Sequence, residues 1–98
     1  MEEYQILGVE ENQNNIYGMD IYPNPTSQEI TIVATFTKNE KIKILITDML
    51  GKTIISLKES IASGKYSKKI DMKGLSGGVY FVTLSTDEGL AVRNVVKK

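Results

Sequence analysis

The sequence predicts an all-β fold, an antiparallel β-sandwich of about seven short strands. Several segments alternate apolar and polar residues and are rich in β-branched side chains, as half-buried strands are. Turn-forming residues separate these segments, and no segment carries a sustained helical stripe. A length of 98 residues with 41% hydrophobic and 24% charged residues fits one domain with one modest core. We therefore take the chain as a single sandwich with an N-terminal extension.

The extension is predicted to be a linker, or the tail of a preceding region, over residues 1–18. Its "GVEENQNN" stretch is polar and has no strand or helix periodicity. The folded domain is then expected over residues 19–98. Its first feature is "IYPNP", which holds both prolines of the chain, Pro23 and Pro25. Proline fixes φ and removes an amide donor, so this stretch should end a short strand and begin the next one at a set angle.

The two clearest strands come next. Residues 29–36 place Ile30, Ile32, Ala34 and Phe36 on one face, and residues 41–47 place Ile42, Ile44 and Ile46 on one face. The polar residues 37–40 between them are predicted to form a hairpin turn. A second turn follows at residues 47–53, where Asp48 suits the first turn position and Gly51 can adopt a positive φ.

The remaining elements are two weaker and two stronger strands. Residues 53–58 and 66–72 are the weaker pair, separated by Ser63 and Gly64. Residues 78–85 and 89–97 flank "TDEG", a predicted hairpin loop. The last strand is expected at or near a sheet edge, where Arg93, Lys97 and Lys98 would act as exposed charges against edge-to-edge pairing.

Composition excludes much chemistry. The chain has no cysteine and no histidine, which rules out a disulfide, a Cys/His zinc site and a Ser-His-Asp triad built from this chain alone. Asp71, Asp87 and Glu88 stand where strands meet turns, but they lack the regular acidic spacing of a calcium loop. Turn formation is the favoured interpretation of these three carboxylates. The sequence therefore predicts no enzyme, no cofactor and no metal.

Charge is uneven along the chain although the net charge is zero. Residues 1–50 hold three lysines and eight carboxylates, whereas residues 51–98 hold nine basic and four acidic residues. The basic half has no interleaved aromatic platform, so a solvated face is favoured over nucleic-acid binding. The acidic N-terminus shows no signal peptide, and no apolar run is long enough to span a membrane. If the domain is exported, we expect the export signal on a longer parent chain.

Three separated motifs, in order and with tight spacing, give a more specific indication. They are "IYPNPTSQEITI" at 21–32, "ITDMLGKTI" at 46–54 and "IDMKGLSGGVYFVTLSTDEGLAVRNVVKK" at 70–98. Together they resemble the C-terminal sorting domain of the type IX (Por) secretion system over roughly residues 19–98. The residues that carry the likeness are Tyr22, Pro23, Asn24 and Pro25 in the first motif, Asp48 and Gly51 in the second, and Leu75, Gly78, Tyr80, Lys97 and Lys98 in the third.

The resemblance implies an immunoglobulin-like sandwich that acts as a secretion signal. In this family the domain is the C-terminal part of an exported protein and directs its N-terminal passenger across the outer membrane of a Gram-negative bacterium. The implied partners are the outer-membrane translocon, a shuttle protein and a surface sortase that removes the domain. The implied route runs through the periplasm to the cell surface or the medium. Residues 8–18 are the expected region of removal, because cleavage needs accessible extended chain.

The last hairpin is the expected recognition site. A partner strand that pairs with its exposed edge would obtain affinity from main-chain hydrogen bonds and selectivity from alternate side chains. The candidate recognition residues are Gly78, Tyr80, Val92, Arg93, Val95, Val96, Lys97 and Lys98. A purely structural role for Gly78 and Tyr80 is the competing interpretation.

One alternative function stays open at this point. A generic accessory module, fibronectin-like or carbohydrate-binding, would share the sandwich fold and remain attached to the secreted protein.

Overall fold

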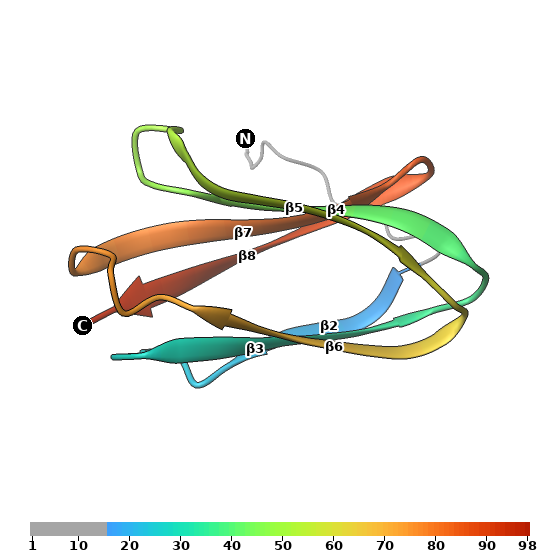
Figure 1. Cartoon of the computed structure of the whole chain (residues 1–98), viewed down its shortest axis with the longest axis horizontal. Coiled ribbons are helices and arrows are strands. Elements are labelled where there is room, and N and C mark those ends of the chain that lie inside the picture. Colours follow the sequence, from blue (N-terminus) through green and yellow to red (C-terminus); the bar gives the residue numbers. More distant parts are fainter. Residues whose placement is uncertain (1–15) are drawn as a thin grey trace, which may run out of the picture.

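The computed structural model describes residues 16–98 and confirms an all-β sandwich (Figure 1). Two antiparallel sheets face each other, one of three strands and one of four. The strands of the described part are β2 (Ile16–Tyr22), β3 (Glu29–Phe36), β4 (Glu40–Thr47), β5 (Thr53–Ile61), β6 (Gly64–Asp71), β7 (Gly78–Thr86) and β8 (Gly89–Lys97). Within this part of the chain no helix is long and apolar enough to cross a membrane.

The order of strands is β2-β3-β6 in one sheet and β5-β4-β7-β8 in the other. The β7–β8 connection is a hairpin, as the sequence predicts, and the turn predicted at residues 47–53 joins the paired strands β4 and β5. The hairpin predicted at residues 37–40 is wrong. β3 and β4 belong to different sheets, so this segment crosses from one sheet to the other. Its polar residues suit any exposed connection, and they do not specify which strand pairs with which.

The core follows the alternation of the two clearest strands. All the apolar residues predicted to face inward on β3 and β4 are buried, from Ile30 to Ile46. Val82 and Leu84 of β7 and Ala91 and Val95 of β8 complete the inner face of the four-stranded sheet. Burial of these side chains supplies the main stabilising term of a domain of this size.

Strand β2 begins before the expected start of the domain at residue 19. Ile16 is fully buried and belongs to the core, together with Met19 and Ile21. The spacing of these residues is irregular because the register with β3 shifts between Tyr17 and Asp20. This irregularity hides the strand from a search for strict alternation. The rest of the predicted linker, residues 1–15, lies outside the described residues.

One side of the sandwich, between edge strands β5 and β6, is joined by side chains. Tyr66 donates its hydroxyl hydrogen to Glu59 Oε1 at 2.7 Å, and Lys68 Nζ lies 2.8 Å from Glu59 Oε2. The Tyr66 ring also meets Phe36 edge to face, with the ring centroids 6.1 Å apart. The bonds from Lys68 and then from Tyr66 lower the pKa of Glu59, whereas burial and then the Glu59 bond raise the pKa of Tyr66.

Candidate functional site

The side chains of β8 that face outward are not all those that the sequence predicts to be exposed. Ala91, Val95 and Lys97 face the interior, and Val96 is 40% exposed on the outer face. The expectation that Lys97 is an exposed charge is wrong, because only 8% of this residue is accessible. Its Nζ donates to the carbonyl oxygen of Lys98 at 3.1 Å, which satisfies part of the ammonium group at the rim of the core.

The outer edge of β8 is covered by the proline-containing segment between β2 and β3. Thr26 N–H donates to Val96 O at 2.9 Å, and Lys98 N–H donates to Thr26 O at 2.8 Å, which forms a short parallel bridge. Asn24 extends this pairing through its side chain, since Nδ2 donates to Asn94 O at 3.0 Å and Val96 N–H donates to Oδ1 at 2.9 Å. The Asn24 carboxamide thus takes the place of a peptide group.

Thr26 anchors this segment to the rest of the fold. Its hydroxyl donates to Glu29 O at 2.8 Å and accepts from Gln28 N–H at 3.2 Å. These bonds satisfy a polar side chain that is 2% exposed. Met72 N–H, just beyond β6, donates to Gln28 O at 2.7 Å. The segment therefore ties the end of β8 to the three-stranded sheet.

The edge of β8 is consequently not open along its length. The Arg93 guanidinium donates to Val92 O at 2.8 Å, which protects another main-chain group on the same strand. The sequence predicts an exposed edge on the last hairpin, and this is wrong for the stretch from Asn94 to Lys98. The partner segment lies about 70 residues away along the chain, so no local pattern reveals it.

The third motif runs from the end of β6 through β7 and β8, and its Leu75, Gly78 and Tyr80 lie in the turn before β7 and at the start of that strand. Leu75 N–H donates to Met72 O at 3.1 Å and closes that turn. Tyr80 is buried, and its hydroxyl donates to Ser76 O at 2.7 Å, so the ring fills the core while the hydroxyl fixes the loop. Gly78 pairs with Lys97 and has φ 153°, a conformation that L side chains rarely adopt.

The second motif folds as the sequence predicts. Asp48 Oδ1 accepts hydrogen bonds from Leu50 N–H and Lys52 N–H, each at 2.9 Å, and Gly51 N–H donates to Asp48 O at 3.1 Å. Gly51 adopts φ 86°, which completes the turn. Met49 and Leu50 occupy its tip, where polar residues are usual, and Leu50 is 93% exposed.

The three motifs meet at one end of the sandwich, on the left in Figure 1. There the β4–β5 turn and the β6–β7 connection lie near the C-terminus. Thr26 pairs with Lys97, Gly78 pairs with Lys97, and Thr47 pairs with Phe81. Sequence reasoning missed Met49, Leu50 and Phe81, which are exposed apolar residues of the four-stranded sheet or its turn. Val96, an expected recognition residue, is also exposed on this sheet, and Tyr22 is exposed on the three-stranded sheet. Phe81 and Val96 lie on the outer face of the neighbouring strands β7 and β8, and adjoining exposed apolar groups are typical of interaction surfaces.

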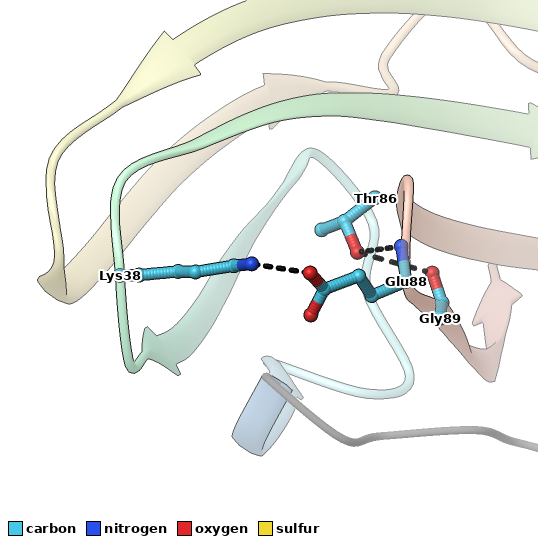
Figure 2. A network of polar contacts seen from close by, with 4 residues as sticks. All are labelled: Lys38, Thr86, Glu88 and Gly89. Carbon is cyan, nitrogen blue, oxygen red and sulfur yellow. Dashed lines mark hydrogen bonds and ion pairs between the residues drawn. The ribbon is translucent and has the colours of Figure 1, made fainter.

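The opposite end carries the β7–β8 loop. Figure 2 shows Lys38 paired with the Glu88 carboxylate, while Glu88 N–H donates to Thr86 Oγ1 at 3.1 Å. The bond to Glu88 raises the pKa of Lys38. These contacts fit the turn-forming interpretation of Glu88. In the described part of the chain no cluster of three acidic residues could hold a metal ion.

Comparison with known families agrees with this arrangement of motifs. The family model for the secretion system C-terminal sorting domain matches residues 20–98. The chain belongs to this family. No curated protein matched the chain in the corresponding search. The sorting domain is thus a C-terminal secretion signal of the type IX system, and its parent protein is bound for the cell surface or the exterior. The family is one of sorting signals and not of enzymes.

Proposed function

We propose that the sorting domain directs an N-terminal passenger through the type IX translocon across the outer membrane, with the shuttle protein as a second contact and with removal by a surface sortase. Transit through the periplasm precedes these steps. Membership of the sorting-domain family carries the proposal. The contacts among the motifs at one end of the sandwich support it: Thr26 of the first motif pairs with Lys97 of the third, and Thr47 of the second pairs with Phe81 of the third.

The candidate recognition residues divide by burial. Tyr80, Val95 and Lys97 are buried, which favours a role in shaping the site. Gly78, Val96 and Lys98 are exposed and are placed to meet a partner directly. Val92 and Arg93 are half-buried on the same strand. We assign direct contact to the exposed set and support of the strand to the others.

The cleavage step is assigned to the chain before β2. Ile16 is fully buried in the core, so residues 16–18 of the expected region of removal belong to a folded strand. Proteolysis concentrates in exposed chain outside such strands. We therefore narrow the proposed region of removal to residues 8–15, which lie outside the described residues.

Secretion of a reporter tests the recognition site. The 98-residue chain is fused behind a reporter with its own signal peptide in a bacterium that uses the type IX system. We expect the wild-type fusion outside the cell and the Val96→Asp fusion in the periplasm. Ser67→Asp is the matched control, because Ser67 is an exposed strand residue of the other sheet. Undiminished secretion of Val96→Asp would contradict the assignment of this residue.

The intact mass of the secreted reporter tests removal of the domain. Cleavage predicts a mature protein lighter than its precursor by most of the 10.9 kDa of the chain. An accessory module would stay attached, so an unchanged mass would favour that alternative.

A further inference from the structure

We infer that the edge of β8 from Asn94 to Lys98 is a strand-binding surface, and that an extended strand of a protein partner displaces the Asn24–Thr26 segment from it. The inference rests on the proposed function in one respect, since the partner is taken to be a component of the secretion machinery. It adds the surface, the mode of binding and the segment that must move.

The first support is the set of main-chain groups along this edge. Asn94 O, Val96 N–H, Val96 O and Lys98 N–H all point away from β7, and the Asn24–Thr26 segment satisfies all four. A row of alternating donors and acceptors is what an added β-strand uses. The segment already seated there shows that the edge accepts a chain parallel to β8.

The second support is that the present occupant is a poor strand. Only Thr26 contributes main-chain groups, whereas β7 pairs with β8 at every position from Gly78 to Thr86. Pro23 and Pro25 have no amide hydrogen, so the Asn24 side chain must complete the pairing. A partner strand with free amides would make the same four bonds through its backbone and replace a contact of limited strength.

The third support is the setting of the edge. Val96 lies on the outer face with Phe81 on the neighbouring strand, and both are exposed. Lys98 is also exposed, at the end of the strand. The partner that fits is therefore an extended polypeptide with an apolar side chain over Val96 and an acidic residue near Lys98.

Hydrogen exchange at single amides tests the displacement. The probe is the purified type IX translocon with its shuttle protein in detergent, added to the 98-residue chain. We expect exchange at the Thr26 amide to rise at least tenfold, because its bond to Val96 O is lost. The Val96 and Lys98 amides should stay protected, because the incoming strand takes over their bonds. This opposite response distinguishes displacement from binding elsewhere.

Variants at Asn24 sharpen the test. In the free domain Asn24→Ala should raise exchange at the Val96 amide roughly three- to tenfold, which corresponds to the loss of one modest hydrogen bond. The same variant should bind the translocon more tightly, since less binding energy is spent on displacement. Asn24→Asp keeps the acceptor for Val96 N–H but loses the donor to Asn94 O, so exchange at the Val96 amide should rise less than in Asn24→Ala. Ser27→Ala, an exposed neighbour, should change neither quantity.

The outcomes separate the inference from the proposed function. If the translocon binds while Thr26 exchange is unchanged, or if Asn24→Ala binds more weakly, the displacement inference is wrong and the sorting function stands. If the wild-type chain neither binds nor directs secretion, the proposed function fails and the inference fails with it. Hydrogen exchange at the core amides of Ile44 and Val82 must remain slow in each variant. A rise at these amides would show that the variant destabilises the whole domain, and the claim that Asn24 acts only at the β8 edge would be wrong.

Discussion

The two lateral sides of the sandwich are closed by different kinds of interaction. On the side where β2 meets β8, the closure is mainly through backbone groups, with Thr26 bonded to Val96 and Lys98. On the side between β5 and β6, it is through the side chains of Glu59, Tyr66 and Lys68. Backbone pairing depends on geometry and is insensitive to pH, whereas an ion pair responds to pH and salt. The β2–β8 side, which holds the first motif and the end of the third, is thus closed mainly by groups that do not titrate.

Thr26→Val should have the largest effect on stability. The substitution keeps the shape of the side chain but removes both hydroxyl bonds and leaves Glu29 O and Gln28 N–H without this partner. We expect a loss of about 1–3 kcal/mol in the free energy of unfolding, measured by urea denaturation. A loss near zero would show that this anchor does not hold the β2–β8 side together.

Glu59→Gln tests the other side through pH. The folded-state pKa of Glu59 is below its ordinary value of 4.5, so its stabilising contribution is present above that value. The contribution is lost as pH falls through the lower folded-state pKa. The wild type should exceed Glu59→Gln by about 0.5 kcal/mol at pH 7, a small figure because the pair is partly exposed and screened. The two proteins should converge in denaturation at low pH, and a constant difference would contradict this account.

Lys38→Ala should have the smallest effect. The Lys38–Glu88 pair joins two loops at the end away from the motifs, and both side chains are about half exposed (Figure 2). Exposed pairs of this kind contribute little to stability. We expect no measurable change in the unfolding midpoint and no change in secretion. A clear loss of secretion would extend the recognition surface to this end.

Much of the fold follows from local pattern. The isoleucines of β3 and β4 alternate strictly, and their inward face was predictable because only one phase of the alternation is apolar. Strand β8 is ambiguous, since Val92 and Val96 fall in one phase and Ala91 and Val95 fall in the other. In the structure the set with Ala91 and Val95 faces the core, and Lys97 belongs to this set and is therefore buried. The sequence alone does not show which of the two sets faces the core. Sheet membership of β3 and β4 depends on long-range pairing, and local turn residues do not encode it.

The candidate site was predictable in its parts but not in its assembly. Asp48 and Gly51 form a local turn, so their roles follow from residue type alone. Asn24 gives no such local signal, because its partners Asn94 and Val96 are remote in sequence. The two prolines indicated a stiff connection, and the structure adds that the residue between them pairs with the final strand.

Secretion measured beside stability tests the central claim most directly, which is that the machinery reads the end of β8 and not the stability of the domain. Reporter fusions of Val96→Asp and Glu59→Gln are compared for the secreted fraction and for the unfolding midpoint. We predict that Val96→Asp keeps a near wild-type midpoint and is retained in the periplasm, whereas Glu59→Gln is less stable and secreted normally. If secretion instead follows stability, with Glu59→Gln retained and Val96→Asp secreted, the central claim is wrong.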